Sequence, residues 1–400
     1  MGVVVGDARS IPLPDGSVQT CVTSPPYFGL RDYGVDGQIG SEDSLDAFLA
    51  TMVDVFREVG RVLRDDGTVW LNLGDSFAGG HSGEKSAGDG PGALSSGLTR
   101  KPGKRKYRGA IRTRPIGDFR PKCKMLVPHR LAIALCDDGW IVRQDIVWAK
   151  PNPMPESVTD RPTTAHEFVF LLAKQPRYYY DAEAVREPHD FPKATRRSAK
   201  VSEAEIAAFH GKAPGNRGRA GLHHAGRNKR SVWHIPSHPF PDAHFATFPP
   251  KLVEPCILAG TPQKACPTCG AGWVREVKVT GQNRADEGRI AEFVAKGVPR
   301  TSANLYLVGC KAGERETIGF APNCGCPNND GSGKALVLDP FAGSGTTGVV
   351  ARQMGREFFG VELNPEYAAM ANARIRSEGE GRTRAVDGDG RVSEQLVMGI

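Results

Sequence analysis

The stretch Asp339-Pro340-Phe341-Ala342-Gly343-Ser344-Gly345-Thr346-Thr347-Gly348 begins after a short apolar run at 335–338. A helical pattern covers 344–354, a second apolar run covers 357–361, and a second helical pattern covers 365–375. Strands that alternate with helices in this way are typical of a sheet with helices on both faces. We therefore predict an α/β fold, built on a doubly wound, parallel, Rossmann-like sheet.

The glycines of this stretch form a G-x-G-x-x-G pattern, which lets the backbone approach a ligand beside a helix N-terminus. Glu362 ends the next predicted strand, where its carboxylate can accept hydrogen bonds from both ribose hydroxyls of a nucleoside. A phosphate-binding P-loop would need Gly-Lys-Ser/Thr, and this stretch has no Lys. An NAD site fits the glycines but leaves Asp339-Pro340 unexplained. The Asp339 carboxylate suits the cationic amino group of S-adenosylmethionine instead.

A second motif, Thr23-Ser24-Pro25-Pro26-Tyr27, follows the apolar run 18–22. Proline lacks an N–H and restricts the residue before it, so the carbonyls of Ser24 and Pro25 can be held outward as acceptors. Such acceptors would hold the hydrogens of an exocyclic amino group and turn its lone pair towards a methyl donor. Tyr27 would stack on a base that has left the helix. Taken alone, the motif could also be a proline-rich turn after a strand.

Together the two motifs, with Val361-Glu362-Leu363-Asn364, resemble the β-class S-adenosylmethionine-dependent DNA amino-methyltransferases. The resemblance covers about residues 1–75, 125–180 and 240–376. It implies a circularly permuted sheet assembled from both ends of the chain. The catalytic residues that it implies are Ser24, Pro25, Pro26 and Tyr27. The cofactor contacts that it implies are Asp7, Ala8, Phe248, Asp339, Phe341, Gly343, Ser344, Gly345, Thr346, Glu362 and Asn364.

The family that the chain resembles includes N4-cytosine and N6-adenine enzymes. Serine before Pro-Pro is commoner in the former, and Asp or Asn in the latter, so Ser24 favours methylation of cytosine N4 in duplex DNA by base flipping. Adenine N6 remains open. The sequence is also compatible with a methyltransferase for RNA or protein glutamine, and with a non-catalytic zinc-containing DNA-binding protein.

The positive charge of the chain, +7 overall, is concentrated in two segments. Eleven Lys or Arg lie between Arg100 and Lys124, and ten between Lys193 and Arg230. Basic segments suit a phosphate backbone, although solvated loops can share this composition. We expect a basic loop at 78–124 and a target-recognition region at 178–240, with double-stranded DNA as partner. The residues expected to contact DNA are Arg227, Lys229 and Arg230.

Four of the nine cysteines form two close pairs, Cys266-Pro-Thr-Cys269 and Cys324-Gly-Cys326. Two Gly/Pro-flanked pairs favour a structural Zn²⁺ ribbon, with these four residues as ligands, inside an insert at 261–334. Cys310 could replace one ligand, and a single C-x-x-C could be a redox pair.

The remaining expectations concern domain limits and location. Residues 1–177 and 335–376 should form the catalytic and cofactor-binding halves of one domain, residues 241–260 a cofactor-flanking segment, and residues 377–400 a frayed tail. Within the first half we expect a helix at 44–63, ended by Asp65-Asp66-Gly67, and a strand at 68–73. No apolar run reaches the length of a membrane span, and the N-terminus lacks a signal peptide, so we expect a cytoplasmic protein. A cognate restriction endonuclease is a candidate partner, and nothing in the sequence indicates an oligomeric state.

Overall fold

The computed structural model describes residues 2–30, 34–78, 119–120, 122–188, 226–237, 248–280, 314–379, 383–386 and 392–395. Most of the predicted basic loop and of the target-recognition region, together with Cys310, therefore lies outside the described residues. The chain divides into two compact units. The first comprises residues 1–179, 231–260 and 336–381, and the second comprises 180–230, 261–335 and 382–400.

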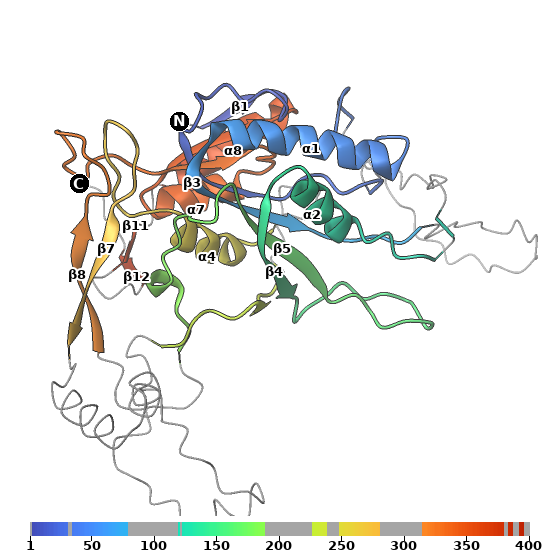
Figure 1. Ribbon diagram of the computed structural model, residues 1–400. Coiled ribbons are helices and arrows are strands. Elements are labelled where there is room, and N and C mark those ends of the chain that lie inside the picture. The colour runs from blue at the N-terminus through green and yellow to red at the C-terminus, as the bar shows by residue number, and fades with distance from the viewer. Residues whose placement is uncertain are drawn as a thin grey trace, which may run out of the picture. The chain divides into compact units, whose positions relative to one another are not determined.

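The first unit is built on an eight-stranded sheet in the order β1-β10-β9-β2-β3-β5-β4-β6. Figure 1 labels β1, β3, β4 and β5 of this sheet. The strands in that order are Val3–Val5, Glu357–Glu362, Leu336–Asp339, Val18–Thr23, Leu63–Leu73, His166–Ala173, Ile141–Ala149 and Val232–His234. Strand β2 lies beside β9, with Cys21 paired to Leu338. Segments from both ends of the chain are thus neighbours in the sheet, as the resemblance implied.

The prediction of a wholly parallel sheet was wrong at one side. From β1 to β3 the strands are parallel, but β5 is antiparallel to both β3 and β4. The segment between β4 and β5, residues 150–165, contains no helix. A parallel partner requires a crossover connection, usually a helix, whereas a loop returns the chain in the opposite direction. The missing crossover therefore accounts for the antiparallel strand.

Helices cover both faces of this sheet. Cys21, Val69 and Leu71 belong to the core cluster that also contains Phe48 and Met52 of α1 (Leu45–Val62). Side chains alternate along a strand, so Thr20 and Thr68 face the other way. There they approach Gly260 at the end of α4 (Pro250–Gly260).

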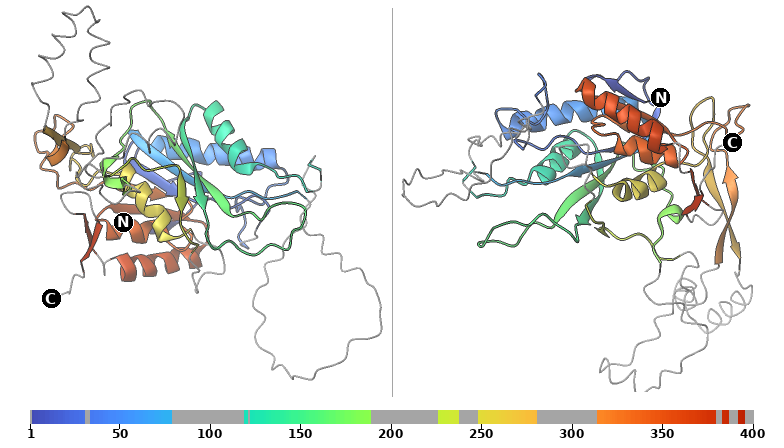
Figure 2. Two further views of the ribbon diagram at one scale, coloured as in Figure 1. Left: turned by 90° about the horizontal axis from the view of Figure 1, so that it is seen from below. Right: turned by 180° about the vertical axis from the view of Figure 1, so that it is seen from behind.

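The remaining helices follow the same division. Helix α2 (Val127–Asp137) contacts α1, whereas α7 (Thr346–Gln353) contacts both α4 and α8 (Pro365–Gly379). Figure 2 shows α7 and α8 side by side. The prediction of a doubly wound arrangement is consistent with these two helical layers.

Helix α1 begins and ends where the sequence predicts. Ser44 caps its N-terminus and accepts a hydrogen bond from the Ala47 backbone N–H at 3.1 Å. The next strand, however, starts at Leu63 rather than at Thr68. Gly67, predicted to end the helix in a turn, lies inside β3, where a Cβ atom would be 2.7 Å from Leu63 Cγ and 2.9 Å from the Gln19 carbonyl oxygen. This glycine therefore permits close packing within the sheet.

The described residues of the second unit form two antiparallel strand pairs and a short 3₁₀ helix, η1 (Glu183–Val185). Strand β7 (Val274–Thr280) pairs with β8 (Glu314–Ala321), and β11 (Thr383–Val386) pairs with β12 (Val392–Gln395). The tail was predicted to be frayed, which is wrong for β11 and β12. Asp-Gly pairs, a common hairpin signal, separate the two strands in the sequence.

Among the described residues, no helix combines the length and the apolar character that crossing a membrane requires.

Candidate active site

The two sequence motifs meet at one edge of the sheet. Thr23, Asp339 and Glu362 are the last residues of β2, β9 and β10, three parallel strands whose carboxyl ends lie at the same edge. A cavity of about 1040 Å³ opens there and is lined by residues of both motifs. The carboxyl edge of an open α/β sheet is where such folds bind ligands.

Most of the predicted site residues line this cavity. The four predicted catalytic residues, Ser24, Pro25, Pro26 and Tyr27, all do so. Nine of the eleven predicted cofactor contacts also line it: Asp7, Ala8, Phe248, Phe341, Gly343, Ser344, Thr346, Glu362 and Asn364. The other two, Asp339 and Gly345, lie outside the cavity lining.

The glycine loop has the backbone geometry that its sequence requires. Gly343 and Gly345 have φ angles of +49° and +78°, a region that other residues rarely adopt. A Cβ atom on Gly345 would lie 3.0 Å from Ala371 Cβ in α8. A Cβ atom on Gly348 would lie 2.7 Å from the Phe358 ring in β10. Gly343 and Gly345 therefore permit the turn. Gly345 and Gly348 permit close packing against α8 and β10.

Glu362 presents a positioned carboxylate to the cavity. Its Oε2 accepts a hydrogen bond from the Gly343 backbone N–H at 2.9 Å, and its Oε1 accepts one from the Asn364 N–H at 2.9 Å. Burial raises the pKa of this carboxyl above its ordinary value. Each carboxylate oxygen has a second lone pair, so the group can also accept hydrogen bonds from a ligand with two neighbouring hydroxyls. This geometry fits the ribose of S-adenosylmethionine.

Asp339 makes buried hydrogen bonds within the chain. Its side chain is 1% exposed and accepts hydrogen bonds from three donors. These are the Thr23 hydroxyl at 2.7 Å, the Phe341 backbone N–H at 3.1 Å and the Thr347 hydroxyl at 2.8 Å. Burial raises the pKa of Asp339 to about 6. The carboxylate thus connects the catalytic motif with the glycine loop. Its expected contact with the cofactor stays a prediction.

Tyr27 is held by polar groups that the sequence reasoning missed. Its hydroxyl donates a hydrogen bond to Glu167 Oε2 at 2.8 Å, and Asn72 Nδ2 donates to the same oxygen at 3.3 Å. Glu167 also forms an ion pair with Lys150. A Cβ atom on Gly74 would lie 2.6 Å from Tyr27 Cε2, so this glycine leaves room for the ring.

These surroundings keep the phenol neutral. Burial and the neighbouring Glu167 carboxylate raise the pKa of Tyr27 well above its ordinary value. A signal for Glu167 was present in the sequence, because this carboxylate comes directly before the apolar run 168–173, which forms most of β5. Its partners lie too far away along the chain to be identified by spacing.

Comparisons with known proteins agree with this site. The model of the N6/N4 DNA methylase family matches residues 18–266 and 329–373. The Type II methyltransferase M.Cfr9I of Citrobacter freundii is 38% identical over 377 residues, which cover 93% of this chain and 87% of that protein. M.SmaI of Serratia marcescens is 36% identical over 376 residues, covering 93% and 90%. The chain belongs to the N6/N4 DNA methylase family. The resemblance inferred from the motifs is confirmed, and the methyl donor of this family is S-adenosylmethionine.

Two solved structures also resemble this methylase, at low scores. PvuII DNA methyltransferase (cytosine-N4-specific) gives a TM-score of 0.47 at 15% identity and covers 94% of this chain and 90% of its own. A putative DNA modification methylase of Thermus thermophilus, complexed with S-adenosyl-L-methionine, gives 0.44 at 20% identity and covers 95% of each chain.

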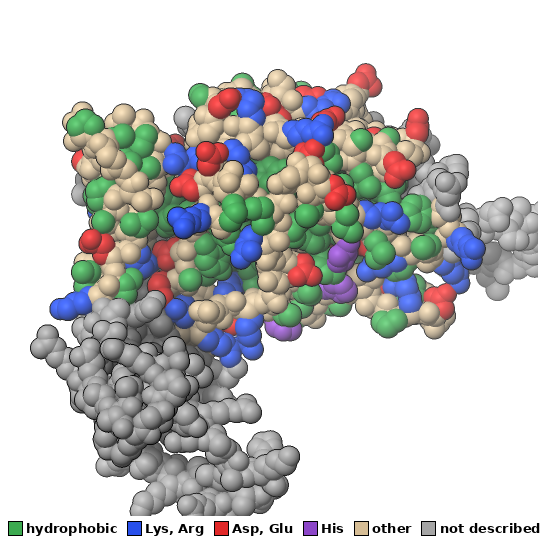
Figure 3. Space-filling model, in the orientation of Figure 1, with side chains coloured by type: hydrophobic (Ala, Val, Ile, Leu, Met, Phe, Trp, Pro, Cys, Tyr) green, Lys and Arg blue, Asp and Glu red, His purple; other side chains and the backbone are tan. Residues whose placement is uncertain are grey.

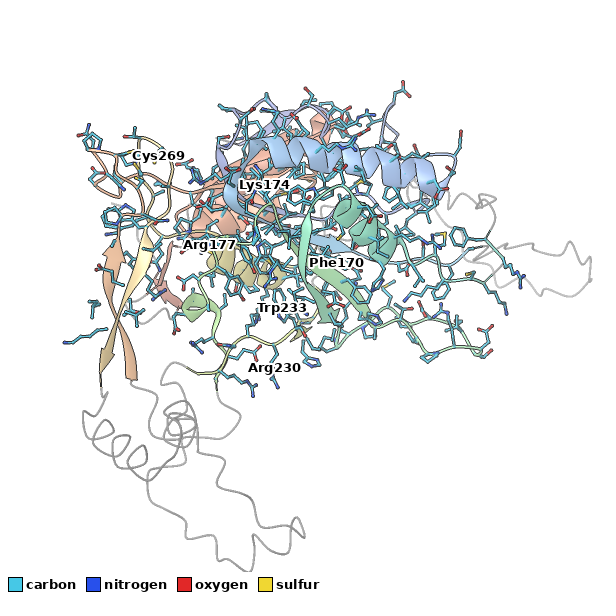
Figure 4. All side chains as sticks on the ribbon, in the orientation of Figure 1. Phe170, Lys174, Arg177, Arg230, Trp233 and Cys269 are labelled. Atoms are coloured by element: carbon cyan, nitrogen blue, oxygen red, sulfur yellow. The ribbon has the colours of Figure 1, made fainter. Side chains whose placement is uncertain are left out.

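In the second unit of the methylase, the three predicted DNA contacts surround one carboxylate. Arg227, Lys229 and Arg230 each form an ion pair with Glu187, at 3.4, 3.7 and 3.0 Å. The Arg230 side chain is 61% exposed (Figure 4). Contact of Arg227, Lys229 and Arg230 with DNA stays a prediction.

Figure 3 shows acidic side chains interspersed with basic ones on the upper part of the face that it presents.

The four predicted metal ligands of the methylase also come together in the second unit. The sulfur atoms of Cys266, Cys269, Cys324 and Cys326 all lie within 4.8 Å of one another. None of the four residues lines the active-site cavity.

Proposed function

We propose that this methylase transfers a methyl group from S-adenosylmethionine to N4 of cytosine in duplex DNA, at a base that has left the helix. The observation that carries the proposal is that Ser24-Pro25-Pro26-Tyr27 and Glu362 line one cavity. An acceptor set for an amino group and a carboxylate suited to a ribose are therefore within one binding space.

The residues present fit the methyl donor. Glu362 is positioned by the Gly343 and Asn364 N–H groups and would accept the ribose hydroxyls. Phe341, Phe248 and Asp7 lie in the same lining and would hold the rest of the nucleoside. When bound, S-adenosylmethionine supplies a methyl group on a positively charged sulfur that an amine lone pair can attack.

The chain's own residues would orient the amine. Ser24 Oγ and the Pro25 carbonyl oxygen would accept hydrogen bonds from the two amino hydrogens. Those bonds would turn the nitrogen lone pair, otherwise delocalised into the ring, towards the methyl donor. Tyr27 would stack on the base, and its hydrogen bond to Glu167 would fix the orientation of its ring. After transfer the extra proton would leave to solvent.

Adenine N6 is the alternative target, because the same two acceptors could hold either amino group. The preference for cytosine rests on Ser24, which occupies the position before Pro-Pro.

The substrate class can be tested with labelled S-adenosylmethionine. Purified protein would be incubated with duplex DNA, RNA and a protein extract in separate reactions. We expect label in DNA only, and loss of that label in Tyr27→Ala. Label in RNA or protein with none in DNA would contradict the proposal.

We further propose that the methylase acts in restriction–modification with a cognate endonuclease. M.Cfr9I, M.SmaI and M.XycI of Xanthomonas campestris pv. cyanopsidis are named Type II methyltransferases and match more than nine-tenths of the chain. Digesting DNA from expressing cells with a panel of restriction endonucleases should identify a protected site. Uniform cleavage by the whole panel would contradict a role in restriction–modification.

We also propose that the sheet is circularly permuted, because the catalytic motif precedes the cofactor motif along the chain.

A further inference from the structure

The Cys266/Cys269 and Cys324/Cys326 cluster is not used by the proposed methyl transfer. We propose that these four cysteines bind one structural Zn²⁺ ion. Their sulfur atoms lie within 4.8 Å of one another. Zinc–sulfur bonds of ~2.3 Å in a tetrahedron place the sulfurs roughly 3.8 Å apart, so small adjustments would complete the site. All four are free thiols rather than disulfides.

A hydrogen-bond donor from outside the cluster contacts one of the sulfur atoms. Asn329 Nδ2 donates to Cys324 Sγ at 3.2 Å, and Asn329 Oδ1 in turn accepts from Trp273 Nε1 at 2.7 Å. Hydrogen bonds of this outer kind orient the ligands of metal sites. The surroundings of the cluster thus suit a metal–thiolate site.

One backbone hydrogen bond joins the two cysteine segments, and another closes the first segment on itself. Ala265 N–H donates to the Gly333 carbonyl at 2.9 Å, and Cys266 N–H donates to the Ala271 carbonyl at 2.8 Å. A Cβ atom on Gly333 would lie 2.8 Å from the Ala265 carbonyl oxygen. One cysteine segment precedes β7 and the other follows β8, so a bound metal would close the base of this strand pair. Figure 4 labels Cys269 in the loop before β7.

A structural metal also answers a packing need. Among the described residues of 261–334, the buried apolar side chains are those of Pro262, Ala265, Cys266 and Ala271. Val274 and Val277 of β7 are each 39% exposed, and Ile318 of β8 is 61% exposed. A strand pair with so little apolar burial usually needs a metal or disulfides to be stable. Four cysteine ligands leave no open coordination position, so the ion would be structural rather than catalytic.

Metal content of the purified full-length protein tests this proposal without DNA or methyl donor, so it is independent of the proposed function. We expect one zinc per chain by inductively coupled plasma mass spectrometry. The double variant Cys269→Ser/Cys326→Ser should lose it. The matched control, Cys123→Ser/Cys136→Ser, replaces two exposed cysteines outside the cluster and should keep it.

A second measurement covers the case in which the double variant does not fold. Titrating wild-type protein with a mercurial reagent in the presence of a chromogenic chelator should release one zinc as four thiols react. Cobalt substitution should give the absorption spectrum of a tetrahedral thiolate site. Protein without stoichiometric metal, or with these cysteines in disulfides, would overturn the proposal. Stoichiometric iron would overturn the choice of zinc.

Discussion

The hydroxyl of Thr23 donates a hydrogen bond of 2.7 Å to the buried carboxylate of Asp339, 316 residues further along the chain. The same carboxylate accepts a bond from Thr347 at 2.8 Å. Removing a carboxylate from water is costly unless its oxygens are hydrogen-bonded. Here the bonds come from both motifs, so Asp339 fastens the strand before Ser24 to the glycine loop.

Asp339→Ala should lower the free energy of unfolding by about 1–3 kcal/mol, because it leaves buried hydroxyls without their acceptor. Thr347→Val, which removes one of the donors without touching the cavity lining, should reproduce part of this loss. Urea unfolding and titration with S-adenosylmethionine should show stability and affinity falling together. If Asp339→Asn abolished cofactor binding at unchanged stability, Asp339 would instead contact the cofactor directly.

The raised pKa of Asp339 also has a consequence for pH. In the unfolded chain this carboxyl has its ordinary pKa of 3.8, and in the folded protein about 6. Between these values the folded state binds more protons, so the contribution of Asp339 to stability falls as pH rises from about 4 to about 6. A difference of ~2 pKa units corresponds to roughly 3 kcal/mol at most.

The pH effect should be measured as the difference between wild type and Asp339→Asn in urea unfolding at several pH values. This difference removes the contributions of carboxyls with lowered pKa, such as Glu58 and Glu187, whose effect has the opposite sign. A pH-independent difference would contradict the raised pKa.

Glu362→Ala should weaken S-adenosylmethionine binding at least about ten-fold, because hydrogen bonds to a charged group contribute ~1.5–3 kcal/mol each. Calorimetry gives the Kd. DNA affinity in the absence of cofactor, measured by fluorescence anisotropy, should stay at the wild-type value and serves as the control. Wild-type cofactor affinity in this variant would exclude Glu362 from the ribose site.

Tyr27→Ala should reduce kcat/KM for duplex DNA by about ten- to a hundred-fold, since stacking of a base on an aromatic side chain contributes ~1–3 kcal/mol. Tyr27→Phe keeps the ring but loses the bond to Glu167, so a smaller loss is expected. Glu167→Gln should resemble Tyr27→Phe if Glu167 acts by positioning the ring. Equal rates for wild type and Tyr27→Ala in single-turnover methylation would rule out stacking.

Gly345→Ala should destabilise the protein more than Gly355→Ala. Both glycines have positive φ angles, +78° and +71°, so both substitutions carry the cost of ~1–2 kcal/mol for a left-handed backbone. Only at Gly345 would the new Cβ atom also meet α8, 3.0 Å from Ala371 Cβ, whereas Gly355 has nothing within 4 Å. Thermal unfolding compares the two variants, and an equal loss would mean that contact with α8 adds nothing.

The parts of the fold with strong local signals could be predicted from the sequence. The periodic apolar face of α1 and its Ser44 cap are local, and so is the strand–helix alternation after residue 335. The direction of β5 and the pairing of β6 with β4 depend on long-range contacts, and no local pattern reports them.

The candidate site divides in the same way. The motifs predicted that Ser24–Tyr27 and Glu362 belong to one site, and these residues line one cavity. The cysteine pairs predicted a four-residue cluster, and the four sulfur atoms lie close together. It did not identify the partners of Asp339 and Tyr27, because Thr23, Thr347 and Glu167 become neighbours of these groups only in the folded chain.

We propose that the site formed by Ser24-Pro25-Pro26-Tyr27 directs methylation of the amino group of cytosine in DNA. Nucleoside mass spectrometry of duplex DNA treated with purified protein and S-adenosylmethionine tests it most directly. Wild-type protein should give N4-methylcytosine, and Tyr27→Ala should give little or none. N6-methyladenine as the product would contradict the assigned base, and unmodified DNA would contradict the activity itself.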